Sequence, residues 1–198
     1  MRRYWLIFLI SVCGLTHLSW AHDHAMPLAL NKEPAYTEKS LYNLSSRWTT
    51  HTGKKMKLDV LRGKVRVVAM TYTHCEDSCP ILVAQMKQID KRLPDAARLQ
   101  VGYVLISLDP QRDTPTVLNA YAQKMDLKSD SWTLLHGSAE DVLEVAVVFG
   151  MRYKKDQGGA FSHSNLLTVL NTEGEIVWQN ESNKVDLEQA LEVLKKLW

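Results

Sequence analysis

The chain has 198 residues, 45% of them hydrophobic, and carries 24 Lys and Arg against 22 Asp and Glu. The two signs of charge are interspersed, without a basic stripe or a block of one sign, which argues against a nucleic-acid-binding protein. The length is enough for one domain with a substantial hydrophobic core.

The first 21 residues predict an export signal. Arg2 and Arg3 form a short basic region, residues 5–18 are mostly apolar, and residues 19–21 place small side chains where a signal peptidase reads. Cleavage after Ala21 would leave the protein in the periplasm or another extracytoplasmic compartment. The alternative is an uncleaved anchor facing the same compartment, which the apolar stretch disfavours because it is shorter than the ~20 residues of a spanning helix.

Loss of this segment changes the cysteine count. It would remove Cys13, whose neighbours fit a lipoprotein site poorly, and leave only Cys75 and Cys79. A bridge between these two would close a five-residue loop and add little stability. We therefore expect the pair to have a function other than cross-linking the fold.

Residues 22–40 are polar, contain two prolines and show no periodicity, which predicts a flexible tether. After cleavage the chain would begin His22-Asp23-His24. A free amine, two backbone amides and the His24 imidazole would form a square-planar nitrogen site suited to Cu(II) or Ni(II). An ordinary polar tail is the equally weighted alternative.

Residues 41–198 predict one α/β domain. Strands and helices alternate along the middle of this segment, which requires parallel strands with right-handed crossovers. The expected fold is thioredoxin-like, a central mixed β-sheet flanked by helices, with an N-terminal β-hairpin. The expected elements are a hairpin over 41–58, strands 65–72, 99–108 and 132–135, helices 81–93, 115–125 and 139–149, a hairpin over 166–179 and a final helix over 187–197. The buried face predicted for helix 139–149 consists of Val142, Leu143, Ala146 and Phe149.

Cys75 and Cys79 lie at the turn between strand 65–72 and helix 81–93. The unpaired N–H groups and the dipole of a helix N-terminus favour a thiolate, the form that binds soft metals and attacks disulfides. Thioredoxin-type redox pairs have two intervening residues, whereas the three found here can separate the sulfurs enough to hold a metal ion. A metal site, a redox site and a combined site all remain open.

Three separated motifs resemble the Sco/SenC family of thioredoxin-fold proteins, which are linked to copper delivery for the binuclear copper centre of cytochrome c oxidase. The resemblance covers roughly residues 41–198. The motifs, in chain order, are Tyr72-Thr73-His74-Cys75 to Cys79-Pro80, Ser107-Leu108-Asp109-Pro110-Gln111-Arg112-Asp113-Thr114-Pro115, and Phe161-Ser162-His163-Ser164.

The resemblance implies that Cys75, Cys79 and His163 bind copper, with Asp109 organising a loop or contacting a ligand from behind. Two thiolates and an imidazole favour Cu(I), with Cu(II) as a further possibility. The chain departs from the family pattern at Glu76, where a proline is common. We do not expect His74 to be a ligand, since it should point away from the second cysteine.

Two functions follow from this site. The first is a metallochaperone that passes copper to the copper-site subunit of cytochrome c oxidase or to another copper-accepting protein. The second is a thiol–disulfide reductase, in which Cys75 and Cys79 keep the target's copper-ligand cysteines reduced. The sequence does not decide whether the chain is an enzyme. A distal imidazole favours the first function, and Gly158-Gly159 predict a loop that copper orders over 154–163.

Overall fold

The computed structural model describes residues 36–156, 161–182 and 184–198. The strands within these ranges are β1 (Trp48–Thr50), β2 (Lys55–Met56), β3 (Val65–Thr71), β4 (Val101–Ser107), β5 (Trp132–His136), β6 (Tyr153–Lys155), β7 (Phe161–His163), β8 (Leu166–Leu170) and β9 (Ile176–Glu181). The helices are α1 (Ser78–Arg92), α2 (Asp95–Arg98), α3 (Pro115–Lys124), α4 (Ala139–Val148) and α5 (Leu187–Lys195), with short 3-10 helices η1 (Leu41–Asn43) and η2 (Leu58–Leu61).

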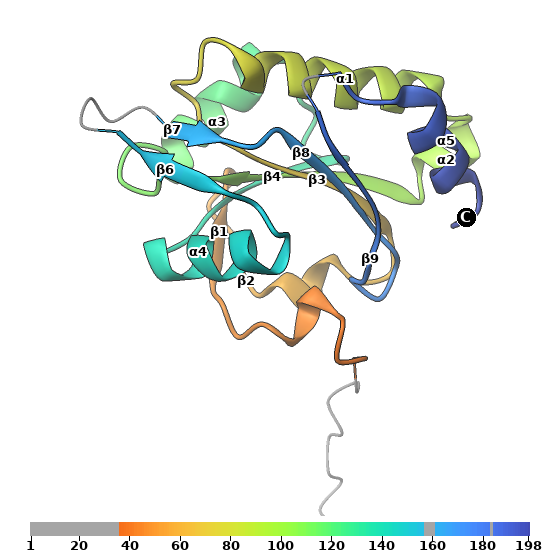
Figure 1. The fold of residues 1–198 in the computed structure, drawn as a ribbon, viewed down its shortest axis with the longest axis horizontal. Helices are drawn as coiled ribbons and strands as arrows, with labels where there is room; N and C mark the ends of the chain where they lie inside the picture. Colours follow the sequence, from red (N-terminus) through yellow and green to blue (C-terminus); the bar gives the residue numbers. More distant parts are fainter. Residues whose placement is uncertain (1–35, 157–160, 183) are drawn as a thin grey trace, which may run out of the picture. The chain divides into compact units, whose positions relative to one another are not determined.

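The described strands form a seven-stranded sheet in the order β2-β1-β5-β4-β3-β8-β9 and a separate pair, β6-β7 (Figure 1). In the large sheet β3, β4 and β5 are parallel, while β1 and β8 run antiparallel to their neighbours β5 and β3. The carboxyl ends of β3 and β4 therefore meet at one edge, so the segments that follow Thr71 and Ser107 lie side by side. This edge is the usual place for a site in an α/β sheet.

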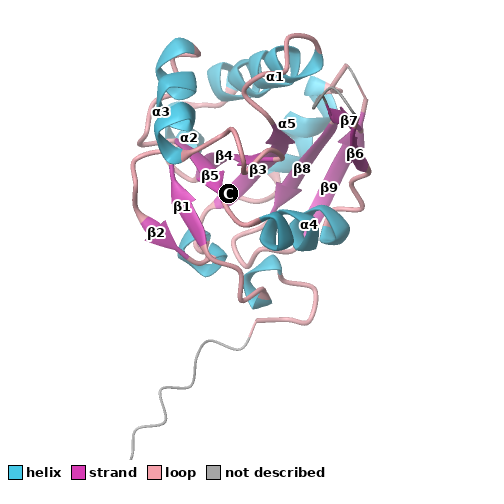
Figure 2. Cartoon of the chain, turned by 90° about the vertical axis from the view of Figure 1, so that its left-hand side faces the viewer, coloured by secondary structure: helices cyan, strands magenta, loops and turns pink. Residues whose placement is uncertain are grey.

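Helices cover both faces of the sheet, with α1, α3 and α5 on one side and α4 on the other (Figures 1 and 2). Alternate residues of the central strands enter two cores, because successive side chains of a strand point to opposite faces. Val67 packs into the core under α1, whereas Val68 packs into the core under α4. The predicted fold class, a mixed sheet flanked by helices in thioredoxin-like order, is confirmed.

The N-terminal hairpin differs in detail from its prediction. Residues 41–43, expected as strand, form the 3-10 helix η1, whose start is capped by the Ser40 hydroxyl, which accepts the N–H of Tyr42. The strand proper begins at Trp48 and pairs with β2 on one side and β5 on the other. The hairpin is thus an extension of the main sheet.

Helix α4 corrects the predicted buried face. Leu143 is 54% exposed, whereas Val145 is fully buried beside Val142, Ala146 and Phe149. The helix is apolar on most of its circumference, so the pattern alone left its orientation ambiguous.

The β6-β7 pair was expected to be a loop. Tyr153 pairs with His163, Lys154 with Ser162 and Lys155 with Phe161 in an antiparallel register. We call these two strands the β6–β7 arm. In the part of the chain that the structure describes, no helix is both long and apolar enough to cross a membrane.

Candidate metal centre

The two cysteines are held by the start of helix α1. The helix begins at Ser78, earlier than predicted, so Cys79 lies in its first turn and is fully buried. Asp77 occupies the capping position but its side chain makes no capping hydrogen bond. The sulfur of Cys75 takes this role, because it accepts the backbone N–H of Cys79 at 3.4 Å and lies 3.9 Å from the Ser78 hydroxyl.

This arrangement makes the two thiols different. Burial raises the pKa of Cys75, but hydrogen bonds from the side chain and backbone of Cys79 and the backbone of Asp77 outweigh it, and the pKa is lowered overall. Burial and the hydrogen bond with Cys75 raise the pKa of Cys79. The pair thus consists of a sulfur that is 9% exposed and has a lowered pKa, Cys75, and a fully buried sulfur with a raised pKa, Cys79.

His163 comes 84 residues after Cys79 but lies beside it, at the end of β7. Its Nε2 is 3.6 Å from the Sγ of Cys79. Its Nδ1 lies 3.1 Å from the carbonyl oxygen of Ser164, to which an Nδ1–H group donates. That hydrogen bond leaves the lone pair on Nε2, directed at the sulfurs, in the tautomer that suits a metal ligand.

Aromatic side chains position the imidazole. The Tyr72 ring meets the His163 ring edge-on, with centroids 5.8 Å apart, and lies 5.1 Å from the Phe161 ring. Tyr72 follows β3 and leads into the cysteine turn, while Phe161 begins β7. The contacts therefore connect the β6–β7 arm with the segment that carries Cys75.

One atom each from Cys75, Cys79 and His163 lie within 4.8 Å of one another, and the described residues contain no other such group of His, Cys, Asp or Glu. Three ligands around a trigonal ion with bonds of about 2.1 Å would lie about 3.6 Å apart. The three atoms are therefore close to the spacing that one ion requires, and two sulfurs with one imidazole suit a soft ion such as Cu(I).

Asp109 lies outside this group of three. Its side chain is 1% exposed and pairs with Arg112 and, at 3.3 Å, with the Nζ of Lys155. Lys155 belongs to β6, and its Nζ also lies 5.2 Å from the centre of the Phe161 ring. Asp109 thus connects the end of β4 with the β6–β7 arm that carries His163.

Asp113 is a residue that sequence reasoning missed. It is fully buried and accepts hydrogen bonds from the Thr73 backbone, the Thr73 hydroxyl and the Ser107 hydroxyl at 3.0, 2.5 and 2.7 Å. Through Thr73, two residues before Cys75, and Ser107, the last residue of β4, it joins the carboxyl ends of β3 and β4. Its place in the motif Asp109 to Pro115 was the only signal for it.

The remaining candidates lie elsewhere. His74 is exposed, its Nδ1 lies 3.8 Å from the carboxylate of Asp113, and it is not in the group of three atoms. Cys13, His22 and His24 lie outside the described residues.

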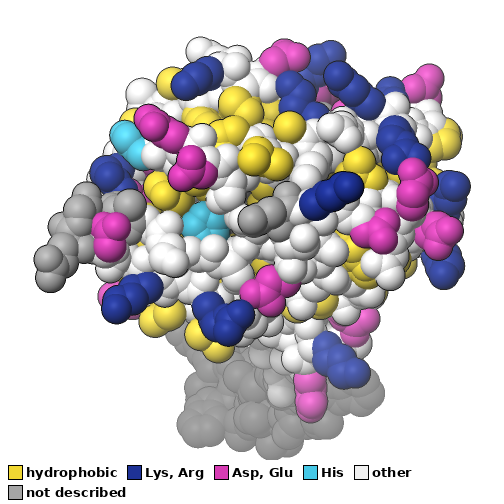
Figure 3. Space-filling model, turned by 45° about the horizontal axis from the view of Figure 1, so that its top comes forward, with side chains coloured by type: hydrophobic (Ala, Val, Ile, Leu, Met, Phe, Trp, Pro, Cys, Tyr) yellow, Lys and Arg dark blue, Asp and Glu magenta, His cyan; other side chains and the backbone are white. Residues whose placement is uncertain are grey.

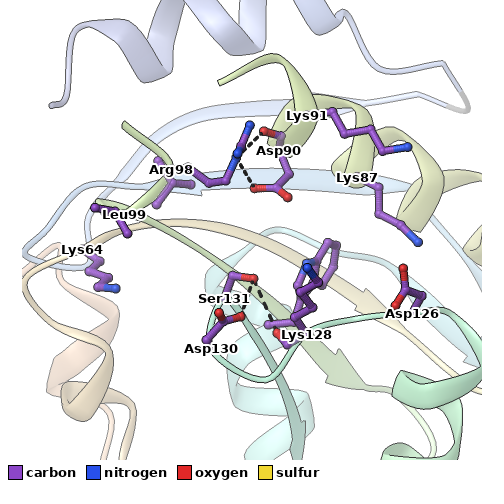
Figure 4. Close-up of a pocket in the computed structure, with 12 residues that line it drawn as sticks. Lys64, Lys87, Asp90, Lys91, Arg98, Leu99, Asp126, Lys128, Asp130 and Ser131 are labelled. Carbon is purple, nitrogen blue, oxygen red and sulfur yellow. Dashed lines mark hydrogen bonds and ion pairs between the residues drawn. The ribbon is translucent and has the colours of Figure 1, made fainter. Parts of the chain in front are cut away.

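A hollow of about 600 Å³ lies at the opposite edge of the sheet, where β3, β4 and β5 begin (Figure 4). Two of its cations are hydrogen-bonded to backbone carbonyls: Lys87 donates to that of Met125 at 2.8 Å, and Arg98 donates to that of Asp90 at 3.2 Å. It contains no thiol or imidazole, and we do not assign it a role.

Comparison with known proteins gives one consistent result. The SCO1/SenC family model matches residues 35–198. A Bacillus subtilis SCO1 protein homolog is 28% identical over 128 residues, which cover 63% of this chain and 66% of that protein. The chain thus spans about two thirds of the length of this relative.

Solved structures agree with the fold. Arabidopsis thaliana ScoI with copper bound has a TM-score of 0.63 and 26% identity, covering 76% of this chain and 94% of that chain. BsSco, in which a disulfide switch is identified, is described as a member of the Sco family of cytochrome c oxidase assembly proteins. Its structure has a TM-score of 0.66 and 26% identity, covering 76% of this chain and 90% of that chain. A SCO1/SenC family lipoprotein from Bacillus anthracis has a TM-score of 0.71 and 26% identity over 82% and 99%.

Proposed function

The chain belongs to the SCO1/SenC family, and from this premise we propose that it binds one copper ion through Cys75, Cys79 and His163 and passes it to a copper-accepting protein. The observation that carries the proposal is that these three ligand atoms, from the turn before α1, its first turn and the end of β7, lie within 4.8 Å of one another. Copper-bound structures of relatives support the choice of metal.

Cu(I) is the favoured state of the ion. The soft sulfurs of Cys75 and Cys79 and the neutral Nε2 of His163 form a three-coordinate set that Cu(I) accepts, whereas Cu(II) prefers more ligands of nitrogen and oxygen. Only the reduced pair of cysteines offers this set, so copper loading depends on the redox state of the pair.

We propose that the recipient is the copper-site subunit of cytochrome c oxidase, and that the transfer takes place outside the cytoplasm. Support for the recipient comes from BsSco, which is described as a member of the Sco family of cytochrome c oxidase assembly proteins. Support for the compartment comes from the export signal predicted for residues 1–21 and from the lipoprotein relative of Bacillus anthracis.

A second candidate function is thiol–disulfide reduction, which the unequal thiols favour. The Cys75 thiolate would attack a target disulfide, form a mixed disulfide and release one target thiolate. Cys79 would then lose its proton and attack the Cys75 sulfur, releasing the second target thiolate. The target gains two electrons and the Cys75–Cys79 pair becomes a disulfide.

The deciding experiment is an anaerobic Cu(I) titration of the reduced protein against a competing chelator. We expect one ion per chain, with the dissociation constant raised by more than about tenfold in His163→Ala and further in Cys75→Ser. His74→Ala is the matched control, since His74 adjoins Cys75 but lies outside the ligand group. If Cu(I) binding were weak and equal in the wild type and in His163→Ala, only the two thiols would contribute to it, and the reductase function would be favoured.

A further inference from the structure

The turn between the two cysteines carries two acidic side chains. Glu76 and Asp77 are both exposed, and neither takes part in an ion pair within the described residues. The two other acidic groups near the site are different, because Asp109 and Asp113 are buried and hydrogen-bonded. The unpaired carboxylates therefore contribute little to the fold.

An apolar surface adjoins these carboxylates. Ile81, two residues after Cys79, is 53% exposed. It lines a hollow of about 170 Å³ together with Asp77 and Leu82, which Asn165 and Ser182 close from the opposite side. On the face seen in Figure 3, acidic side chains border a patch of hydrophobic ones near the N-terminal end of α1. We call Glu76, Asp77 and Ile81 the acidic rim.

The acidic rim adjoins the ligand residues in the chain. Glu76 and Asp77 lie between Cys75 and Cys79 in the sequence, and both are exposed, whereas Cys79 is fully buried and Cys75 only 9% exposed. A protein that takes copper by ligand exchange at these sulfurs would come within reach of both carboxylates.

The opposite side of the site has less free charge. Strand β6 and the residue before it carry three cations, of which Arg152 pairs with Glu181 at 3.1 Å and Lys155 pairs with Asp109 at 3.3 Å. Lys154 has no ion pair within the described residues. Among the described residues, two carboxylates without an ion pair on the cysteine side, Glu76 and Asp77, thus stand against one cation without an ion pair on the opposite side, Lys154.

We propose that the acidic rim is the docking surface for the copper-accepting protein, which presents an apolar side chain flanked by basic ones beside its own copper ligands. This inference rests on the proposed function. Exposed, unpaired charges at the edge of an interface act mainly on the rate of association and are sensitive to salt. The acidic rim would therefore select basic acceptors by the speed of transfer, without changing copper affinity.

The test uses two synthetic acceptor peptides with the same two-cysteine Cu(I) site, the same leucine and the same copper-quenched fluorophore. One is flanked by four lysines and the other by four glutamates. Transfer from the copper-loaded full-length protein is followed by stopped flow at about 20 and about 500 mM ionic strength, where charges act over roughly 20 and 4 Å.

At low salt we expect transfer to the lysine peptide to be about tenfold faster than to the glutamate peptide, and the ratio to approach one at high salt. Glu76→Gln/Asp77→Asn should reduce the low-salt ratio to about two to three with unchanged Cu(I) affinity. Glu144→Gln/Glu192→Gln removes the same charge from exposed positions on α4 and α5 and should keep the full ratio. Ile81→Ser should slow transfer to both peptides equally.

Two results would overturn the inference while leaving copper binding intact. One is equal rates for the two peptides at low salt, and the other is a full ratio in the Glu76→Gln/Asp77→Asn variant. A wild-type protein that fails to bind Cu(I) would instead overturn the proposed function, and the docking surface with it. Cu(I) affinity, measured first for every variant, separates these cases.

Discussion

Asp113 holds Thr73 by two hydrogen bonds, from the backbone N–H at 3.0 Å and from the hydroxyl at 2.5 Å. The two residues are 40 positions apart in the chain, and the contact fixes the turn that leads to Cys75. The same carboxylate accepts a hydrogen bond from Ser107, so one buried group organises the ends of two parallel strands.

Replacement of Asp113 by Ala should therefore affect both stability and the site. It would leave three donors, the N–H and hydroxyl of Thr73 and the hydroxyl of Ser107, without their acceptor, at a cost of about 2–4 kcal/mol in the free energy of unfolding. Urea denaturation measures this directly. Asp95→Ala, which removes an exposed partner of Arg98, should change stability by less than about 0.5 kcal/mol. Equal effects for the two variants would contradict the role given to Asp113.

Lys155 should control how firmly the β6–β7 arm holds His163. Lys155→Met removes the contact with Asp109 and leaves the copper ligands untouched. We expect the Cu(I) dissociation rate to rise about three- to tenfold, because outer contacts orient the ligand. The adjacent Lys154→Met is the matched control and should leave the rate unchanged. Lys155→Arg, which keeps the positive charge, should have a dissociation rate close to that of the wild type. A dissociation rate that is the same for all residues at position 155 would show that the arm is held by other contacts.

The two thiols should react with alkylating agents at different rates. Hydrogen bonds lower the pKa of Cys75, whereas burial raises that of Cys79, so the Cys75 thiolate persists to lower pH. Iodoacetamide should modify Cys75 first, and its rate should rise with pH through a midpoint below that of an ordinary thiol. Mass spectrometry of the Cys75 and Cys79 peptides after short exposures measures both. Faster modification of Cys79 would reverse the assignment of the attacking sulfur.

Copper should order the segment that carries His163. The sequence predicts this segment as residues 154–163, of which 157–160 lie outside the described residues. Coordination would fasten it to the buried cysteines, so amide hydrogen exchange at 154–156 and 161–163 should slow by about tenfold on Cu(I) loading. Strand β3, already in the centre of the sheet, serves as the internal reference. The His163→Ala protein should lose the protection, and identical exchange with and without Cu(I) in the wild type would refute the idea.

The sequence predicted the parts of the fold that have strong local patterns. An apolar run, a turn and a helical pattern after it identified β3 and α1. The helix predicted over 115–125 is α3, where the Thr114 hydroxyl accepts the Val117 N–H. The β6–β7 arm was missed because its strands are three residues long and half polar, too short for any period to be read.

The site was predictable only in part for the same reason. Cys75 and Cys79 are close in the sequence, so their spacing alone identifies them as a pair. The placement of His163 rested on family resemblance, because no periodicity connects it with Cys79, 84 residues earlier. The resemblance directed attention to Asp109, but tertiary packing placed Asp113 under the cysteine turn and Asp109 against the arm. Which of two acids in one motif holds a given turn is decided by contacts between distant strands.

The hydrogen bond from the Cys79 amide to the Cys75 sulfur makes the first turn of α1 a sensor of sulfur chemistry. A thiolate, a copper-bound thiolate and a disulfide sulfur differ in the electron density that they offer to this N–H group. Each change at Cys75 therefore alters the strength with which the helix is nucleated, and the Cys79 amide resonance would report the chemical state of the neighbouring sulfur. The chemical shift of the Cys79 amide should therefore differ between the reduced, the copper-bound and the disulfide forms of the protein.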